Sequence, residues 1–227
     1  MKLIILIGFS RGLGKALFDS LIVGLKPGEV ELLALGRNIN NVIKHDGVTY
    51  QEADLLNDDC WDSMSIHIPG NIKLLDVFIN ASVIEPIGTI GNLNTQRLED
   101  AVKVNYLSPM KLVNKLISIQ KKTDFAINLF NISSGASSRA INGWALYCST
   151  KAALKMFLDV AEIESEGLVS VTHIDPGVMD TDMQKTIRSK SKKEMKHVQA
   201  FKELKSTDTL KSPEKAAEEL LFRLGFI

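Results

Sequence analysis

A tyrosine and a lysine four residues apart are the strongest chemical signal in this chain. They are Tyr147 and Lys151, and the surrounding residues 144–161 are rich in alanine, leucine and lysine, which favours a helix. Positions i and i+4 share one face of a helix, so the phenol and the ammonium should lie side by side. A nearby positive charge lowers the pKa of a tyrosine and makes it a usable general acid or base. The pair therefore predicts a proton-transfer site, although the same spacing also arises by chance on exposed helices.

A glycine-rich turn near the N-terminus predicts a binding site for a dinucleotide. Residues 2–7 are a continuous apolar run, as in a buried parallel strand, and residues 15–21 have helical periodicity. The turn between them reads Gly8-Phe9-Ser10-Arg11-Gly12-Leu13-Gly14. Glycines permit a tight turn and let phosphates approach the backbone, and the start of the following helix offers N–H groups to a pyrophosphate. The alternative is a glycine-rich turn that binds no ligand.

The spacing Gly-x-x-x-Gly-x-Gly, taken together with the Tyr-Lys pair, resembles the short-chain dehydrogenase/reductase family. Further segments match that family in its order along the chain: Ala53-Asp54-Leu55, Asn80-Ala81-Ser82, Val104-Asn105-Tyr106, Asn131-Ile132-Ser133-Ser134, and Asp175-Pro176-Gly177 with Thr181. Two positions depart from the family pattern. Ser82 stands where the family has glycine, and Ile7 replaces a threonine before the first glycine. The resemblance spans nearly the whole chain.

The resemblance implies a catalytic tetrad of Asn105, Ser134, Tyr147 and Lys151. Ser134, rather than Ser133, lies thirteen positions before Tyr147, which is the spacing of the family. In the implied reaction, Ser134 binds the carbonyl oxygen of the substrate and Tyr147 donates a proton to the developing alkoxide. Lys151 binds the ribose beside the nicotinamide and lowers the pKa of Tyr147, and Asn105 positions Lys151 through a water.

The expected cofactor is NADP(H) rather than NAD(H). An NAD-selective site commonly places Asp or Glu at the end of the second strand, whereas this chain has Gly36-Arg37-Asn38 there. The forked cation of Arg37 suits a 2′-phosphate, and Arg11 adds a second charge. The alternative is a pair of merely exposed arginines. The predicted cofactor-binding residues are Gly8, Ser10, Arg11, Gly12, Leu13, Gly14, Arg37, Asn38, Asp54, Leu55, Asn80, Ala81, Ser82, Tyr147, Lys151, Pro176, Gly177, Val178 and Thr181.

Strands and helices alternate along residues 1–227. This pattern predicts one α/β domain, a doubly wound parallel sheet of the Rossmann type with strand order 3-2-1-4-5-6. The expected strands are residues 2–7, 30–35, 48–50, 73–79, 125–132 and 168–174. The expected helices are residues 12–25, 55–66, 96–121, 144–166, 197–205 and 212–223, the last with Ser212 as its N-cap and Pro213 at its first position. The family's seventh strand is expected to be short or missing.

Composition argues against several other classes of protein. The 227 residues suit a single domain with a sizeable core, and a formal net charge of zero gives no indication of binding to nucleic acid or to an anionic membrane. The two cysteines form no CxxC pair and the four histidines show no ligand spacing, so no metal site is predicted. A core strand that begins at residue 2, with no apolar run of membrane-spanning length, leads us to expect a cytoplasmic protein.

Residues 179–206 are irregular and basic, and the resemblance implies that they form a mobile lid over the substrate. Met179 and Met183 then line the substrate site together with Ser134, Trp144 and Tyr147. A solvated surface is the plainer interpretation of a charge run, and both interpretations can hold at once.

The segments 143–148 and 176–184 resemble the sepiapterin reductase branch of the family, which includes bacterial benzil reductases. We therefore expect an NADPH-dependent carbonyl reductase that acts on compact aromatic, vicinal-diketone or pterin-like ketones. Animal sepiapterin reductase holds its pterin through a C-terminal aspartate that this chain is expected to lack, so sepiapterin is expected to be the weaker substrate. The alternatives are a true sepiapterin reductase, a catalytically weak NADP(H)-binding regulator, and an epimerase or dehydratase acting on nucleotide-sugars.

The helices expected over 96–121 and 144–166 carry apolar residues on more than one face. One face must cover the sheet, and the other favours a partner subunit. The family pairs its subunits through these two helices, so a homodimer or homotetramer is predicted.

Overall fold

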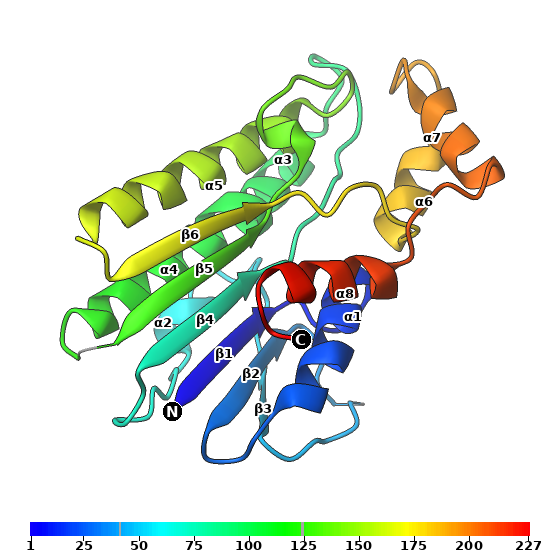
Figure 1. The fold of residues 1–227 in the computed structure, drawn as a ribbon. Helices are drawn as coiled ribbons and strands as arrows, with labels where there is room; N and C mark the ends of the chain where they lie inside the picture. The colour runs from blue at the N-terminus through cyan, green and yellow to red at the C-terminus, as the bar shows by residue number, and fades with distance from the viewer. Residues whose placement is uncertain (41, 124) are drawn as a thin grey trace.

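Six parallel strands form one sheet in the order β3-β2-β1-β4-β5-β6 (Figure 1). The structure is a computed structural model that describes residues 1–40, 42–123 and 125–227. The strands are β1 (Lys2–Ile7), β2 (Val30–Gly36), β3 (Val48–Glu52), β4 (Leu74–Ile79), β5 (Ala126–Ile132) and β6 (Val169–Ile174). The six strands and their order confirm the predicted single-domain doubly wound fold. Their carboxyl ends all meet at one edge of the sheet, where the predicted site residues follow them.

The helices are α1 (Gly12–Leu21), α2 (Cys60–Ser63), α3 (Thr95–Val102), α4 (Ser108–Gln120), α5 (Ala145–Glu164), α6 (Asp182–Arg188), α7 (Val198–Ser206) and α8 (Pro213–Arg223). Most lie where they are expected, and Ser212 caps α8 by accepting a hydrogen bond from the backbone N–H of Lys215. No helix of the described residues combines the length and apolarity that a membrane crossing requires. The cytoplasmic location stays a prediction.

Two helices differ from the expected ones. The helix expected over 55–66 is only the single turn α2, because the Asp54 and Asn57 side chains accept hydrogen bonds from nearby backbone N–H groups and hold the preceding chain in turns. In contrast, α6 forms inside the segment expected to be irregular. Its N-cap is Thr181, whose hydroxyl accepts a hydrogen bond from the backbone N–H of Gln184.

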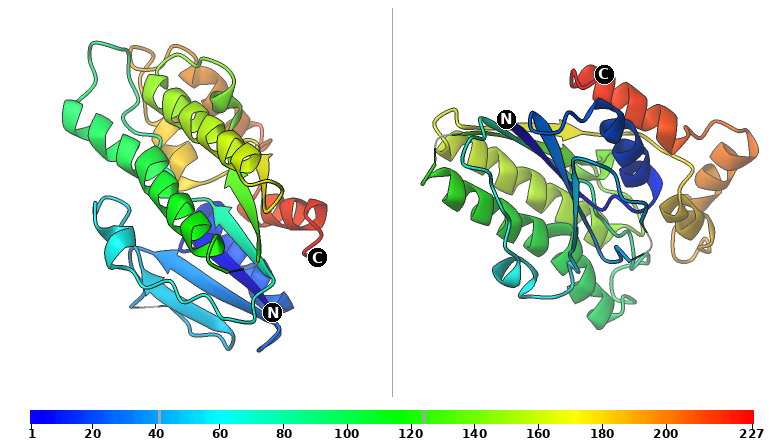
Figure 2. Two further views of the ribbon diagram at one scale, coloured as in Figure 1. Left: turned by 90° about the vertical axis from the view of Figure 1, so that its left-hand side faces the viewer. Right: turned by 90° about the horizontal axis from the view of Figure 1, so that it is seen from below.

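Different helices cover the two faces of the sheet, as the two views of Figure 2 show. Alternate residues of a strand point to opposite faces, so Ile5 packs on one side and Leu6 on the other. Side chains of α2, α4 and α5 cover the face of Ile5, and those of α1 and α8 cover the face of Leu6. A third apolar cluster lies apart from both faces and joins α6 and α7 to the start of α5.

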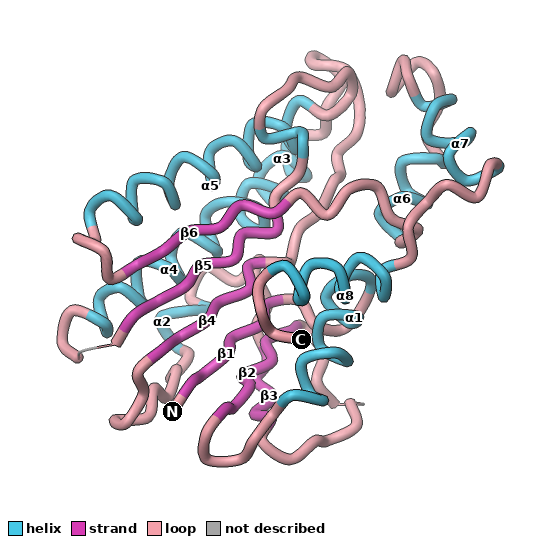
Figure 3. Tube along the Cα trace, viewed as in Figure 1, coloured by secondary structure: helices cyan, strands magenta, loops and turns pink. Residues whose placement is uncertain are grey.

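No seventh strand forms in the described residues, and the chain after α8 continues as loop (Figure 3). Phe226 packs instead on the face of the sheet, with its ring centroid 5.3 Å from that of Phe78 and 5.7 Å from that of Phe130. The Nζ atom of Lys2 lies 4.3 Å from the centroid of the same ring. The C-terminal residues therefore stabilise the core rather than extend the sheet.

The edge of the sheet at β6 is protected by side chains at the end of α5 and just after it. The backbone N–H of Val171 donates to Oε1 of Glu162 at 2.7 Å, and that of Val169 donates to Oγ of Ser165 at 3.0 Å. Edge strands with free N–H groups invite pairing with another chain. Because these two groups are already paired, the edge of β6 is a poor template for a further strand.

Candidate active site

The glycine-rich turn brings the ends of β1 and β4 into close contact. Gly8 has a φ of +84°, and a Cβ atom there would lie 2.9 Å from the Cβ of Ala81. A Cβ on Gly14 would lie 1.8 Å from the carbonyl oxygen of Gly8 and 2.5 Å from Nδ2 of Asn80. That Asn80 amide donates to the same carbonyl oxygen at 2.8 Å. Two of the predicted glycines are therefore required for the turn, and Asn80 and Ala81 lie beside it.

The start of α1 fits a pyrophosphate group. Arg11 at the N-cap makes no side-chain hydrogen bond to the helix, and the first turn holds no acidic residue. The backbone N–H groups of the first turn of α1 therefore lack the side-chain partner that caps many helices. Unpaired N–H groups at the start of a helix bind phosphate. The Leu13 side chain is buried in the core, so only the backbone of Leu13 is available to a phosphate at the start of α1. Thr181 lies opposite, with its Cγ2 atom 3.5 Å from the position of a Cβ on Gly12.

Two arginines and an asparagine follow the ends of β1 and β2. Ile7 pairs with Leu35, and Arg11 and Arg37 both come shortly after this pair. Arg37, Asn38 and Arg11 are exposed, and neither arginine makes an ion pair with another described residue. Two free guanidinium groups thus lie at the edge where the second ribose of a dinucleotide would be placed.

The remaining predicted cofactor residues also follow strand ends. Asp54 comes two residues after β3 and is exposed, whereas the Leu55 side chain is buried.

The chain turns sharply after β6. Gly177 has a φ of +77°, and its N–H donates to Oδ1 of Asp175 at 3.0 Å, which bends the chain just after this strand. The next residue, Val178, is 45% exposed, Pro176 is partly buried and Ser10 is exposed. These positions border one edge of the sheet, as a bound dinucleotide requires.

Tyr147 lies in the first turn of α5 and is buried. Burial raises the pKa of Tyr147 to about 12, while the hydroxyls of Ser134 and Ser82, which face the phenol, act in the opposite direction. Burial therefore dominates this pKa in the structure, and the lowering of it by Lys151 stays a prediction. Lys151 is itself buried, its Nζ donates to the carbonyl oxygen of Ile132 at 2.9 Å, and desolvation lowers its own pKa to about 8. A phenol with a raised pKa is protonated at neutral pH, as a proton donor must be.

The two serines at the end of β5 have different surroundings. Ser133 is buried, and its hydroxyl donates to that of Ser137 at 3.2 Å. Ser134 caps a short 3₁₀ turn by accepting from the N–H of Ala136 at 3.2 Å, and its hydroxyl faces Tyr147. The geometry therefore agrees with the choice of Ser134 made from the spacing.

Asn105 lies in a stretch of π-helix, Lys103–Leu107, that joins α3 to α4. This wider turn interrupts the continuous helix expected over 96–121, and such turns are frequent at functional sites. The Asn105 amide donates to the carbonyl of Val83 at 2.8 Å and to the hydroxyl of Thr150 at 3.2 Å. None of its hydrogen bonds within the described chain reaches Lys151. In this structure Asn105 joins α5 to the loop after β4.

Apolar side chains enclose Tyr147. The ring of Trp144 meets that of Tyr147 edge-on, with centroids 5.7 Å apart, and also contacts Phe201 of α7. Met183 belongs to the same cluster, but Met179 does not. Met179 packs with the cluster of α1 and α8 and bridges to Lys211, so its predicted place in the substrate wall is not supported. The sequence reasoning did not identify Ile84, Ile87, Ile187, Met195, Val198 and Phe201, which complete this wall.

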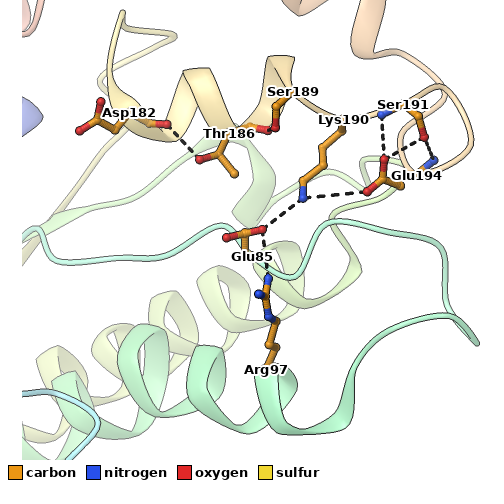
Figure 4. Close-up of polar contacts among 8 residues, drawn as sticks. All are labelled: Glu85, Arg97, Asp182, Thr186, Ser189, Lys190, Ser191 and Glu194. Carbon is orange, nitrogen blue, oxygen red and sulfur yellow. Dashed lines mark hydrogen bonds and ion pairs between the residues drawn. The ribbon is translucent and has the colours of Figure 1, made fainter.

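Ion pairs hold the 179–206 segment against the body of the domain (Figure 4). Nζ of Lys190 lies 3.1 Å from Oε1 of Glu85 and 3.9 Å from Oε1 of Glu194, and only 18% of the Lys190 side chain is exposed. Arg97 of α3 lies 3.3 Å from the same Glu85 oxygen. Lys190 is therefore an ion-pair residue rather than part of a solvated basic face.

The same segment also contacts the residues immediately before α5. The backbone N–H of Lys196 donates to Oδ1 of Asn142 at 2.7 Å. Gly143 has a φ of +83°, and a Cβ there would lie 2.6 Å from the carbonyl oxygen of Glu194. Only glycine allows this approach, so Gly143 positions the segment next to Trp144 and Tyr147.

A hollow of about 250 Å³ lies beside the glycine turn rather than beside Tyr147. It is lined by Gly12, Lys15, Thr181, Asp182 and others, including further carboxylates. None of its lining residues belongs to the apolar cluster around Tyr147. We therefore do not assign the substrate to this hollow. Within the described ranges, no group of three or more His, Cys, Asp or Glu side chains could hold a metal ion.

Comparison with known proteins places this site in a family. A family model described as short chain dehydrogenase matches residues 2–192. The chain belongs to the short-chain dehydrogenase family. It is an oxidoreductase whose fold binds a nicotinamide cofactor, and the residues around the glycine turn fit such a group.

Several relatives of this chain are named as reductases. The chain is 32% identical to "Benzil reductase ((S)-benzoin forming)" of Bacillus subtilis (strain 168), over 97% of this chain and 92% of that protein. It is 28% identical to the sepiapterin reductase of Xenopus tropicalis, over 83% of this chain and 78% of that protein. Among solved structures, the KRED1-Pglu enzyme superposes with a TM-score of 0.79 at 26% identity, covering 96% of this chain and 92% of the other. These similarities agree with the branch indicated by the segments 143–148 and 176–184.

Proposed function

We propose that this protein is an NADPH-dependent carbonyl reductase that reduces one ketone of a compact aromatic or vicinal diketone. The observation that carries the proposal is the Tyr147 phenol, protonated at neutral pH, faced by the Ser134 hydroxyl and enclosed by apolar side chains. An apolar enclosure strengthens hydrogen bonds to a developing alkoxide, because water does not compete for it.

The protein's own groups supply the acid and the orientation. Ser134 and Tyr147 donate hydrogen bonds to the carbonyl oxygen, and Tyr147 then gives its proton to the alkoxide. Lys151 supplies a positive charge near Tyr147, where its Nζ donates a hydrogen bond to the carbonyl oxygen of Ile132 at the end of β5. A bound NADPH supplies the hydride. The intact serine, tyrosine and lysine support an enzyme rather than a silent dinucleotide-binding regulator.

NADPH, rather than NADH, is supported by the ends of β1 and β2. Arg37 and Arg11 are exposed there, and the three residues that end β2 and follow it (Gly36, Arg37 and Asn38) include no carboxylate to accept hydrogen bonds from a ribose. A guanidinium binds a phosphate bidentately. We therefore assign the 2′-phosphate to Arg37, with Arg11 as a second contact.

The substrate class is supported by the wall and by the relatives. The wall around Tyr147 combines Trp144, Phe201 and several aliphatic side chains, which suit an aromatic ring. A pterin instead carries several ring donors that need buried acceptors. Relatives named benzil reductase include one from Bacillus subtilis and one from Saccharomyces cerevisiae, which match over 97% and 96% of this chain, respectively. A true sepiapterin reductase is the alternative, supported by the animal relatives.

The substrate test compares kcat/KM for benzil, phenylpropanedione and sepiapterin, followed by NADPH oxidation. We expect the diketones to be reduced at least about tenfold more efficiently than sepiapterin, since an unpaired buried donor costs about 1–3 kcal/mol. A much higher kcat/KM for sepiapterin would favour the alternative and show that another residue binds the pterin ring.

The Lys190 ion pair gives a prediction about the lid. Lys190→Ala removes the partner of Glu85 and should weaken docking of residues 189–197. A partly buried ion pair is worth about 1 kcal/mol, so we expect KM for the diketone to rise about three- to fivefold with little change in kcat. Steady-state kinetics at low and high salt check this, because salt should raise KM of the unmodified protein toward that of the variant.

Lys192→Ala is the matched control, since Lys192 is exposed in the same segment and makes no ion pair with another described residue. If Lys190→Ala and Lys192→Ala have the same KM as the unmodified protein, the Glu85–Lys190 pair has no role in holding the lid.

An exposed apolar stripe on α5 supports self-association. Met156, Val160 and Ile163 lie on one face of the helix and are 63%, 41% and 80% exposed. We propose that this face pairs with a second copy to form a homodimer or homotetramer. Light scattering at micromolar concentration should give at least twice the chain mass of 25.0 kDa.

Ile163→Glu should shift this mass toward the monomer, because it places a charge within the apolar stripe. Phe222→Glu is the control, since Phe222 is 73% exposed but lies on α8. A monomer for the unmodified chain, or the same loss of mass in both variants, would contradict the proposed interface.

A further inference from the structure

A serine stands beside the catalytic phenol at a position where the family has glycine. Ile79 of β4 pairs with Asn131 of β5, and Ser82 and Ser134 each come three residues after this pair. The two serines therefore follow the ends of neighbouring strands. Both face the hydroxyl of Tyr147. The proposed reaction assigns Ser134 to the carbonyl of the substrate. Ser82 was predicted from the sequence to contact the cofactor, but it has no role in the proposed proton transfer.

Ser82 also contacts Asn105. Its hydroxyl donates to Oδ1 of Asn105 at 3.1 Å, and the backbone N–H of Val83 donates to the same oxygen at 2.8 Å. Asn105 is fixed in turn by its own bonds to Val83 and to Thr150 on the catalytic helix. The single O–H of Ser82 thus has two acceptors within reach, the Asn105 oxygen and, once it is deprotonated, the Tyr147 oxygen. A serine hydroxyl rotates freely between such partners.

We propose that Ser82 is a positioning residue for proton donation, whose O–H turns from Asn105 to the Tyr147 oxygen as Tyr147 gives its proton to the substrate. The inference rests on the proposed role of Tyr147 as the acid. The O–H bond of Tyr147 breaks, the substrate alkoxide gains that proton, and the negative charge moves to the phenolate oxygen. A hydrogen bond to a charged oxygen is stronger than one to a neutral amide, so the exchange of partners is favourable.

The exchange leaves no buried acceptor unpaired. When the Ser82 hydroxyl turns away, Oδ1 of Asn105 keeps the N–H of Val83. An acceptor that lost its only partner would oppose the rotation. The effect of Ser82 on the pKa of Tyr147 has the sign that the proposal requires. Ser82 lowers this pKa, less than Ser134 does, against the larger effect of burial.

The test compares Ser82→Ala with Ser82→Thr, which keeps a hydroxyl. We expect Ser82→Ala to lower kcat for diketone reduction about three- to tenfold while KM and the Kd for NADPH change less than about twofold. The alkaline limb of the pH profile of kcat should move upward by about half a unit or more, because the phenolate loses a donor. Ser82→Thr should restore kcat and the pH profile.

Ser149→Ala is the control, because Ser149 is exposed on α5, the helix of Tyr147, and its hydroxyl donates to the carbonyl of Leu146. A weaker Kd for NADPH with an unmoved pH profile would make Ser82 a cofactor contact and overturn the inference. A lowered Tm with no change in the pH profile would make its role structural and would also overturn it. If Tyr147→Phe keeps its activity, the proposed function itself fails, whereas an inactive Tyr147→Phe with an unmoved Ser82→Ala profile refutes only the role of Ser82.

Discussion

Replacing Tyr147 by phenylalanine should lower kcat for diketone reduction by about 10²- to 10⁴-fold, the usual contribution of a positioned general acid. The ring of Tyr147 packs edge-on against Trp144, and phenylalanine keeps this contact. Only the hydroxyl faced by Ser134 and Ser82 is lost. The Kd for NADPH, measured by quenching of protein fluorescence, should therefore change less than about threefold, and Tm should stay close to that of the unmodified protein.

Tyr50→Phe is the matched control for this substitution. The Tyr50 hydroxyl donates to the carbonyl oxygen of Ile43, and its ring packs against Phe9 and Phe18 far along the chain from α5. This variant should keep nearly all of its kcat. Retention of more than a few per cent of kcat in Tyr147→Phe would remove Tyr147 from the role of proton donor.

Replacing Arg37 by aspartate should change the ratio of kcat/KM for NADPH to that for NADH by about 10²-fold or more in favour of NADH. Loss of a charge-assisted, bidentate contact to the 2′-phosphate costs about 1.5–3 kcal/mol, and the new carboxylate repels that phosphate. The same carboxylate can accept hydrogen bonds from the ribose hydroxyls of NADH. Steady-state kinetics with each cofactor at fixed benzil measure the ratio.

Arg223→Asp makes the same change of charge at an exposed position on α8 and should leave the ratio unaltered. Equal kcat/KM for NADPH and NADH in the unmodified protein would overturn the cofactor assignment. A change of the ratio in Arg223→Asp as large as that in Arg37→Asp would show that net charge, rather than a contact at β2, decides the preference.

The sheet could be predicted because local patterns and topology rules agree. Continuous apolar runs such as residues 2–7 indicate strands buried on both faces, and the alternation with helices then fixes a parallel order. The spacing found in the resembled family also selected Ser134 over Ser133, and the Ser134 hydroxyl faces Tyr147 in the structure. In a parallel sheet, residues after strand ends meet at one edge, so these motifs could be brought together without coordinates.

Features that depend on tertiary contacts could not be predicted in this way. The pKa of Tyr147 follows its burial rather than its spacing from Lys151, and a pattern of residues does not report how deep the helix lies. The contacts of Lys190 with Glu85 and of Lys196 with Asn142 join residues that are 105 and 54 positions apart. Met179 and Met183 looked equivalent in sequence, but the turn before α6 directs them into different clusters.

Product analysis with benzil tests the central proposal most directly. The purified protein is incubated with benzil and a limiting amount of NADPH, and the products are separated on a chiral column. We expect one NADPH to be oxidised for each benzil consumed, with benzoin as the product and its second carbonyl intact, and no such reaction in Tyr147→Phe. Oxidation of NADPH no faster than in the absence of protein, with benzil recovered unchanged, would contradict the proposed function.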